Sequence, residues 1–337
     1  MANPMPHVGT LSRGQVAQKV RLSIIAVRAV CSLLKQHFRT DSGIAVSEIV
    51  EGGSLGYGTY VPMKFDIDLV IYSTSLTADK LRDRDKRKKF LSDLQECVKV
   101  HLKGNYIADK MTENSVQFKY QFSPDNTIDV DVLISPMWGS PVELSQYVSK
   151  NCPTEFFHLS AGAAKWQKKF MSHQTLRVKE YIKRAKYWSL TVNWEAIGGR
   201  KPTSYMMSLL VIKAAEPFEI HMKGRLRQNF KKQLAKDITK NVKTLVKKFE
   251  TIDILFDSDY PFPNALLPSP PRVVDPANIC NNLYETGFGK LRRDEDSEKY
   301  WKKFAENIDT LDLSVAFEHR GFYSDVPAFG KSYQPKY

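Results

Sequence analysis

The chain has 337 residues, enough for two domains, and an ordinary globular composition with 42% hydrophobic and 11% aromatic residues. Its net charge of +13 favours a polyanionic partner such as nucleic acid, a nucleoside triphosphate or an acidic membrane, although a merely soluble basic surface would carry the same charge. The four cysteines lie far apart in sequence, so their spacing excludes a disulfide framework and a zinc pair.

The first residues lack the apolar centre of a signal peptide. The longest apolar stretch, residues 22–34, is interrupted by Arg28 and is too short to cross a bilayer. We therefore expect an intracellular protein without a membrane segment, in the cytoplasm or, as the alternative, in the nucleus.

The first half of the chain predicts a mixture of helices and strands. Apolar residues recur at helical spacing over residues 15–38, and a charged helix is expected over residues 79–103. Alternating apolar residues predict strands at residues 45–51, 65–72, 116–122 and 128–134. A glycine-rich turn, residues 52–59, joins the first two of these strands.

After about residue 150 the pattern becomes mostly helical. Helical periodicity covers residues 162–190, 203–216, 224–251 and 294–306. A long loop is marked by Pro261, Pro263, Pro268, Pro270 and Pro271. The change in pattern predicts an α+β protein with two domains, residues 1–155 and 156–337.

Two pairs of carboxylates follow the glycine-rich turn. Asp66 and Asp68 share one expected strand, and Asp129 and Asp131 share another. Alternate residues of a strand face the same side, so each pair points away from the apolar face. Clustered carboxylates repel one another, and Mg²⁺ relieves that repulsion. Two such pairs favour a two-metal nucleotidyltransferase site over a solvated strand edge, but spacing does not choose between Asp129 and Asp131.

Two stretches are rich in basic residues. Lys179, Lys183 and Lys186 line one face of an expected helix, either as a solvated stripe or as partners for a triphosphate. The second stretch runs from Lys223 to Lys248 and contains ten lysines and arginines but only one carboxylate, Asp237. This run is equally consistent with a nucleic-acid surface and with an exposed helix.

Several segments resemble the 2′-5′-oligoadenylate synthetases and, more widely, the cyclic GMP–AMP synthase-like nucleotidyltransferases. The likeness spans roughly residues 25–310. The segments that carry it are residues 26–35, 46–59, 66–70, 131–136, 181–188 and 274–282.

This resemblance implies a bilobed nucleotidyltransferase fold. A mixed β-sheet lobe with a long spine helix, residues 1–155, would pack against a helical C-terminal lobe, residues 156–337, with the active site between them. Asp66, Asp68 and Asp131 would bind two Mg²⁺ ions, with Mn²⁺ as the alternative metal. The register of the family motif favours Asp131 over Asp129.

The resemblance also implies a set of nucleotide-binding residues. These are Gly53, Ser54, Lys183, Lys186, Ser204 and Tyr205. The glycine and first serine would hold the donor triphosphate, the lysines would contact phosphates, and Ser204 and Tyr205 would touch and stack on a base. The residues alone favour a core role for Tyr205. The Ser-Tyr pair is more like the cyclic GMP–AMP synthases, since oligoadenylate synthetases usually carry Gln before this tyrosine.

Activation by double-stranded nucleic acid is a further implication. Lys35 and Lys168 match basic positions of the family, but Glu51 and Tyr57 stand where oligoadenylate synthetases usually carry lysine. The footprint is therefore altered, or moved toward the second basic run. The residues expected to bind nucleic acid are Lys35, Lys168, Lys231, Lys232, Lys236 and Lys240. The zinc insertion of vertebrate DNA-sensing cyclic GMP–AMP synthase is missing, so zinc is not expected and double-stranded RNA is the expected activator.

Three hypotheses follow for the function. The first is an RNA-activated synthase of 2′-5′-linked oligoadenylates in innate immunity, using ATP, with GTP or other nucleoside triphosphates as alternative substrates. The second is a cyclic-dinucleotide synthase of the cyclic GMP–AMP synthase-like receptors. The third is an inactive relative that binds double-stranded RNA, which ranks last because all three metal carboxylates are present.

Overall fold

A five-stranded mixed sheet forms from the first half of the chain. Its strands are β1 (Glu48–Glu51), β2 (Ile67–Ser73), β3 (Tyr106–Met111), β4 (Ser115–Ser123) and β5 (Asn126–Pro136). Their order is β1-β2-β5-β4-β3, in which β2 and β5 run parallel and the other neighbours run antiparallel. Valine, isoleucine, tyrosine and phenylalanine at alternate positions favour these strands, because such side chains suit a pleated, half-buried surface.

The computed structural model describes residues 13–40, 43–61, 66–151, 156–218, 228–256, 267–289, 291 and 295–315. Phe65, Pro261, Pro263 and the start of the second basic run, residues 223–227, lie outside the described residues. Within the described part of the chain, no helix is both long and apolar enough to span a membrane.

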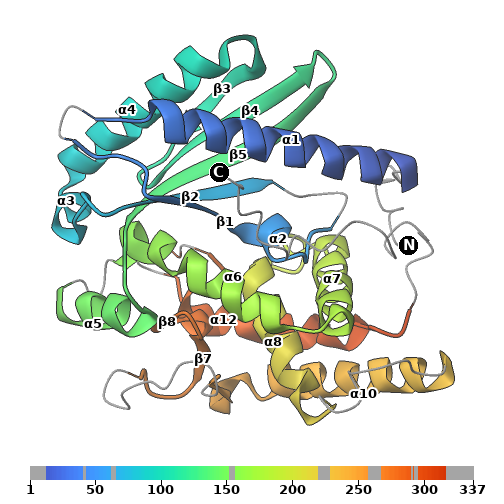
Figure 1. Cartoon of the computed structure of the whole chain (residues 1–337). Coiled ribbons are helices and arrows are strands. Elements are labelled where there is room, and N and C mark those ends of the chain that lie inside the picture. Colours follow the sequence, from blue (N-terminus) through green and yellow to red (C-terminus); the bar gives the residue numbers. More distant parts are fainter. Residues whose placement is uncertain are drawn as a thin grey trace.

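Two long helices pack against each other over one face of the sheet (Figure 1). They are α1 (Arg13–His37), the expected spine helix, and α4 (Arg84–Leu102). Leu34 of α1 and Leu94 and Val98 of α4 are buried against the apolar face of the sheet. The buried side chains shared by these helices and the sheet are called the sheet core below.

Asp83 divides the helix that was expected over residues 79–103. Its carboxylate accepts hydrogen bonds from the backbone N–H groups of Asp85 and Lys86, each at 3.1 Å, and so caps α4. The preceding turns form a separate short helix, α3 (Ala78–Arg82).

Residue alternation gives the sheet one apolar and one functional face. Ile67 and Leu69 of β2 and Val130 of β5 are buried in the sheet core. Asp68 and Asp131 occupy the alternate positions of these two strands, next to the buried residues, so they face the other side. That second face is the one turned toward the helical half of the molecule.

The second face contacts the helical half through Val50, Val70 and Tyr72, which pack with Ala161 and Ala164, and Tyr72 adds hydrogen bonds. Its hydroxyl donates to the carbonyl oxygens of Ala161 and Gly162, both at 3.1 Å, and accepts from the backbone N–H of Lys165 at 3.1 Å. These three residues lie at the start of the helical half, which is thereby fixed beneath β2.

From residue 141 onward the described chain forms seven α-helices and three short strands; the first helix, α5, buries Leu144 and Val148 in the sheet core, and the others belong to the second half. The helices are α5 (Pro141–Asn151), α6 (Ala164–His173), α7 (Leu176–Thr191), α8 (Ser204–Ala215), α10 (Gln228–Lys247), α11 (Leu283–Thr286) and α12 (Ser297–Asn307). The strands β6 (Asp253–Ile254), β7 (Arg272–Asp275) and β8 (Asn278–Asn282) pair in that order. The helix expected over residues 162–190 is divided because Thr175 caps α7 by accepting from the N–H of Val178 at 3.2 Å.

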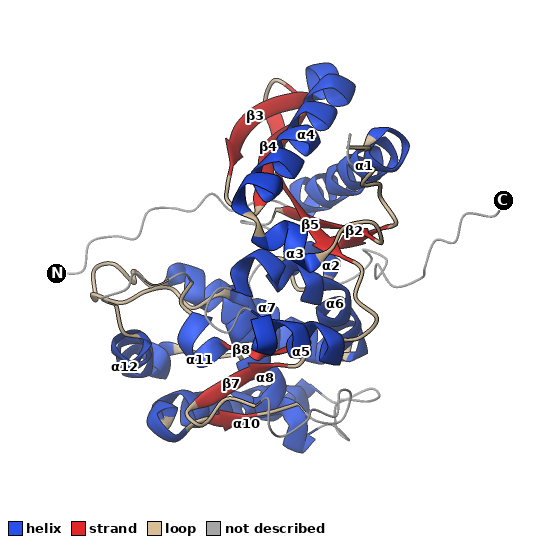
Figure 2. Ribbon diagram, turned by 90° about the vertical axis from the view of Figure 1, so that its left-hand side faces the viewer, coloured by secondary structure: helices blue, strands red, loops and turns tan. Residues whose placement is uncertain are grey.

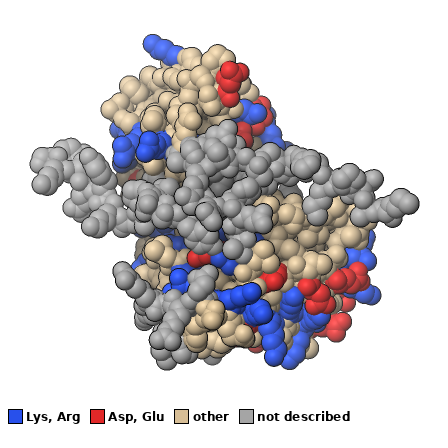
Figure 3. All heavy atoms as spheres, turned by 90° about the vertical axis from the view of Figure 1, so that its right-hand side faces the viewer, with Lys and Arg blue, Asp and Glu red and all other residues tan. Residues whose placement is uncertain are grey.

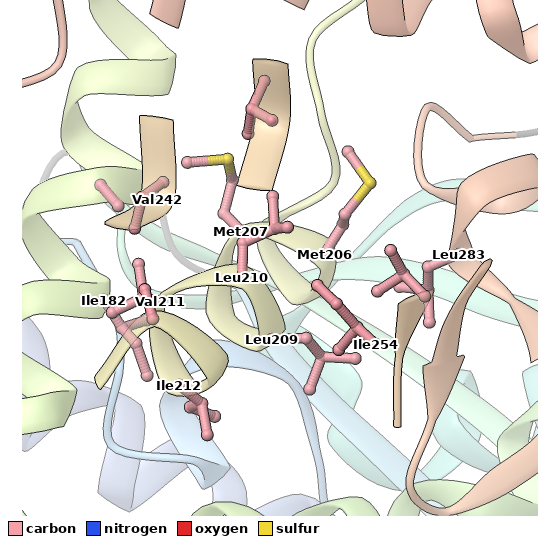
Figure 4. Packing of buried hydrophobic residues seen from close by; sticks show 14 of the residues in the cluster. Ile182, Met206, Met207, Leu209, Leu210, Val211, Ile212, Val242, Ile254 and Leu283 are labelled. Carbon is pink, nitrogen blue, oxygen red and sulfur yellow. The ribbon is translucent and has the colours of Figure 1, made fainter. Parts of the chain in front are cut away.

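Helix α8 forms the centre of the second half. All of Met206–Ile212 are buried, and Figure 4 shows these side chains pointing outward among the surrounding elements. The neighbours include Ile182 of α7, Val242 of α10, Ile254 of β6 and Leu283 of α11. A helix that is apolar on every side is stable only when it is enclosed, so the other helices surround it. These residues are called the helical core.

The sheet with α1 and α4 lies above the helical half (Figure 2). Each core also takes residues from the other half of the sequence. Tyr57, from the glycine-rich turn, packs in the helical core, whereas Trp166 of α6 and Ala277 of the β7–β8 hairpin pack in the sheet core. The domain boundary between residues 155 and 156 stays a prediction.

Candidate active site

Three carboxylates meet where β2 and β5 run side by side. Asp68 of β2 lies opposite Asp131 of β5 in the parallel register, and Asp66 directly precedes β2. Asp68 and Asp131 are partly buried, whereas Asp66 is exposed. Asp129 is also exposed and lies opposite Lys119 of β4. The sheet therefore brings together Asp66, Asp68 and Asp131, and places Asp129 further toward solvent.

Electrostatics shows that these carboxylates affect one another. Burial, together with the charges of Asp66 and Asp131, raises the pKa of Asp68 from 3.8 to about 7, while Lys186 opposes the shift. Burial also raises the pKa of Asp131, and hydrogen bonds from Gln117 and Ser115 partly offset that effect. The donor from Gln117 is Nε2, at 2.9 Å from Oδ2 of Asp131. Without a counter-ion, this arrangement disfavours the ionised forms.

The carboxylate set suits divalent metal ions. The buried Oδ1 atom of Asp131 has no hydrogen-bond partner, so it is available to a cation. Within the described ranges, no group of three or more His, Cys, Asp or Glu side chains is arranged so that it could hold a metal ion. Mg²⁺ characteristically takes only one or two carboxylates and completes its octahedron with waters and substrate phosphates. Asp66, Asp68 and Asp131 fit that use.

A glycine turn lies directly against Asp68. The short helix α2 (Gly53–Gly56) follows β1, and the N–H of Gly52 donates to the carbonyl oxygen of Asp68 at 2.8 Å. Gly53 has a φ of +59°, and a Cβ added there would lie 1.6 Å from Oδ2 of Asp68. Only glycine allows this approach. Ser54, which is partly buried, follows at once, so the predicted triphosphate-binding pair adjoins the predicted metal ligands.

The lysine stripe of α7 faces the end of this turn instead of bulk solvent. Lys186 is buried, and its Nζ donates to the carbonyl oxygen of Thr59 at 2.9 Å. Burial lowers its pKa to about 7, although Asp66 and Asp68 oppose the shift. Lys183 lies over the ring of Tyr60, with Nζ 4.7 Å from the ring centroid, and burial lowers its pKa as well.

Ser204 and Tyr205 begin α8, where Thr203 caps the helix by accepting from the N–H of Met206 at 3.3 Å. Ser204 is exposed. Tyr205 is partly buried against the helical core, and its hydroxyl donates to Oδ1 of Asp275 at 2.9 Å. The core role that the residues alone favoured and an exposed edge for base stacking are both compatible with this position.

The site is also supported by contacts that the sequence analysis did not predict. Gln117 holds Asp131, Thr59 receives Lys186, and Gln167 of α6 donates to Asp275 at 2.8 Å. The alternation of Gln117 with buried residues of β4 is a weak signal for a polar group on the functional face. The sequence carries no comparable signal for the other contacts.

The residues expected to bind nucleic acid fall into two separate groups. Lys35 and Lys168 both lie close enough to Cys31 to affect the pKa of its thiol, which burial raises to about 11. Lys168 is paired with Glu51 at 3.7 Å, and its neighbour Lys165 with Glu48 at 2.7 Å. The negative charges therefore partly neutralise this surface.

The second group lies on α10, in the helical half of the molecule. Its members Lys231, Lys232, Lys236 and Lys240 are all exposed. Two open grooves of about 600 and 980 Å³ flank the helix, and lysines contribute to the lining of both. Figure 3 shows Lys and Arg side chains gathered on the lower lobe beside a group of acidic ones.

Two protein-family models match the chain. The nucleotidyltransferase domain matches residues 31–123, and the C-terminal domain 2 of 2′-5′-oligoadenylate synthetase 1 matches residues 142–293. The chain belongs to the oligoadenylate synthetase-like family of nucleotidyltransferases. The protein that carries the carboxylates, the glycine turn and the lysine stripe is therefore a nucleotidyltransferase.

Individual relatives agree with this assignment. The chain is 23% identical to 2′-5′-oligoadenylate synthase 1A of Rattus norvegicus over 312 residues, which cover 83% of each protein. It is 22% identical to 2′-5′-oligoadenylate synthase 1A of Mus musculus over 313 residues, 84% of this chain and 80% of that protein. Among solved structures, CdnC of E. coli MS115-1 in a complex with HORMA-deltaN has a TM-score of 0.55 at 15% identity, covering 89% of this chain and 84% of that one. The predicted family and the bilobed nucleotidyltransferase fold are confirmed.

Proposed function

We propose that the protein is a Mg²⁺-dependent enzyme that makes 2′-5′-linked oligoadenylates from ATP as an innate-immune signal. The parallel register that sets Asp68 opposite Asp131, beside Gly53, is the observation that carries this proposal. The names of the curated relatives, which are 2′-5′-oligoadenylate synthases, support the choice of product.

Each residue of the site has a role that follows from its surroundings. Divalent ions, when bound by Asp66, Asp68 and Asp131, would lower the pKa of the attacking ribose hydroxyl and neutralise the triphosphate. Gln117 holds the Asp131 carboxylate in one orientation through its hydrogen bond at 2.9 Å. A fixed ligand loses little entropy when the nucleotide and its ions bind.

The proposed phosphate and base contacts come from three elements: the glycine turn, α7 and α8. Gly53 and Ser54 would hold the donor triphosphate, because the bare backbone of Gly53 allows close approach. Lys183 and Lys186 would complete the charge balance, and phosphates nearby would favour their protonated forms. Tyr205 would stack on a base, next to the exposed Ser204.

Double-stranded RNA is the activator that we propose. The net charge of +13 supports a polyanionic partner. Lys35 and Lys168 supply one basic surface, which Glu48 and Glu51 partly neutralise. The four exposed lysines of α10 named above supply the second, which supports a footprint displaced toward that helix.

A cyclic-dinucleotide synthase is the second candidate. Ser204 favours it, because this exposed residue stands where oligoadenylate synthetases usually carry glutamine, and the Ser-Tyr pair resembles that of the cyclic GMP–AMP synthases. The site would then act twice on one pair of nucleotides. An inactive RNA-binding relative is the third candidate, which the presence of Asp66, Asp68 and Asp131 disfavours.

Product analysis separates these candidates. The protein is incubated with Mg²⁺ and all four nucleoside triphosphates, with double-stranded RNA, with double-stranded DNA, or without nucleic acid. Mass spectrometry then distinguishes a linear ladder from a cyclic dimer, and a nuclease specific for 3′-5′ bonds reports the linkage. We expect a nuclease-resistant adenylate ladder that requires RNA. A cyclic product supports the second candidate, and RNA binding without any product supports the third.

A further inference from the structure

Asp275 is a buried carboxylate that the proposed chemistry leaves without a role. It ends β7 and has no exposed surface. Its oxygens accept four hydrogen bonds, from the N–H of Ala277 at 2.8 Å, Nε2 of Gln167 at 2.8 Å, the hydroxyl of Tyr205 at 2.9 Å and Nδ2 of Asn281 at 3.2 Å. Every one of these partners donates; burial raises the pKa of Asp275, and these hydrogen bonds oppose that shift.

A turn residue needs only one of these contacts. The bond from Ala277 N–H is the local one, in which an aspartate closes the turn between β7 and β8. Gln167 of α6 and Tyr205 of α8 are distant in sequence, and each reaches Asp275 from a different helix. A buried carboxylate without hydrogen-bond donors would be costly. The turn supplies one donor, and the two helices supply donors that tie Asp275 to α6 and α8.

The network continues to the glycine turn. Oε1 of Gln167 accepts a hydrogen bond from the hydroxyl of Tyr57 at 2.8 Å. Tyr57 caps α2, and its backbone N–H donates to the carbonyl oxygen of Gly53 at 3.1 Å. The rings of Tyr57 and Tyr205 lie 6.3 Å apart. A continuous, partly buried chain of hydrogen bonds therefore joins the predicted base-stacking residue to the predicted phosphate-binding turn, across the two lobes.

We propose that Asp275 is a positioning residue that fixes Tyr205 relative to the glycine turn, so that the base and the triphosphate of one nucleotide are bound in register. The inference rests on the proposed function, because it takes Tyr205 and Gly53 as nucleotide contacts. Asp275 acts through its partners, and touches no part of the nucleotide itself.

Two conservative tyrosine variants test this while leaving the Asp275 side chain in place. Tyr205→Phe keeps the ring and removes the hydroxyl that donates to Asp275, and Tyr57→Phe removes the hydroxyl that donates to Gln167. Tyr300→Phe is the matched control. Tyr300 lies on α12, and its hydroxyl also donates to a carboxylate, that of Glu295, at 2.9 Å. Binding of ATP and of inorganic tripolyphosphate, both with Mg²⁺, is measured by calorimetry, together with KM and kcat for synthesis.

We expect Tyr205→Phe to weaken ATP binding and raise KM about tenfold, the value of a hydrogen bond to a charged group, with kcat and tripolyphosphate binding unchanged. Tyr57→Phe should weaken ATP binding as well. Asp275→Ala removes both acceptor oxygens and should include both effects, so that adding Tyr205→Phe to it costs little more. Tyr300→Phe should match the wild type.

Effects of Tyr205→Phe and Asp275→Ala that simply add, or a Tyr205→Phe protein that binds ATP like the control, would overturn the positioning role. If the wild type binds ATP but makes no product, the proposed function fails, while the ATP-binding data still test the inference. A wild type that binds no ATP overturns both. Should Asp275→Ala fail to fold, the two tyrosine variants decide the matter alone.

Discussion

At the scale of single residues, the site separates two aspartates that the sequence leaves equivalent. Asp131 and Asp129 share a face of β5, and only the pairing with β2 distinguishes them. Asp131→Asn should reduce synthesis by about a thousandfold or more, because it removes a ligand of the ions that stabilise the transition state. Asp129→Asn should retain activity within about threefold, as expected for an exposed surface residue. Rates of product formation measure both, and the reverse order would show that the other aspartate binds the metal.

The carboxylates also predict how pH and metal affect stability. The folded-state pKa of Asp68, about 7, lies above its ordinary value of 3.8. The unfolded chain therefore releases this proton first, so the group's contribution to stability is lost as pH rises from about 4 to about 7. A divalent ion restores that loss only where the carboxylates are ionised.

Thermal unfolding checks this. Mg²⁺ should raise the Tm by about 3 °C or more at pH 8 and by much less at pH 5.5, with a chelator as the reference. The Asp131→Asn protein should show little response at either pH. An equal shift at both pH values would place the stabilising Mg²⁺ elsewhere.

At the scale of elements, the alternating pattern predicts four of the five strands in the sheet, but it says nothing of which strands are neighbours. β3 was not predicted, because this edge strand is mostly exposed and lacks a buried face. The short β7–β8 hairpin and α5 were missed as well. Helical spacing continues through Asp83 and Thr175, so the sequence pattern predicts single helices where capping side chains divide them.

The charge on α10 gives a prediction for the element as a whole. Replacing Lys231, Lys232, Lys236 and Lys240 by glutamate should weaken duplex RNA binding about tenfold or more and flatten its dependence on salt. The same number of exposed lysines on α4, at positions 86, 88, 89 and 99, provides a control with an equal change in net charge. Binding is measured by fluorescence anisotropy at several salt concentrations. If the two variants lose binding equally, α10 acts only through net charge.

At the scale of the whole molecule, the site depends on both lobes. The sheet supplies the carboxylates, while α7 and α8 of the helical half supply the lysines and Tyr205. The sequence predicts most of these residues, because carboxylate and lysine patterns are local. Contacts such as Lys186 with Thr59, or Gln167 with Asp275, form only when the two lobes are in place, and no local pattern encodes them.

The most direct test is to locate the metal ions. A crystal of the protein grown with Mn²⁺ and a non-hydrolysable ATP analogue would reveal them by anomalous scattering. We predict manganese atoms coordinated by Asp66, Asp68 and Asp131, with the triphosphate against Gly53 and Ser54. Manganese bound elsewhere, or a nucleotide that binds away from these three carboxylates, would contradict the account.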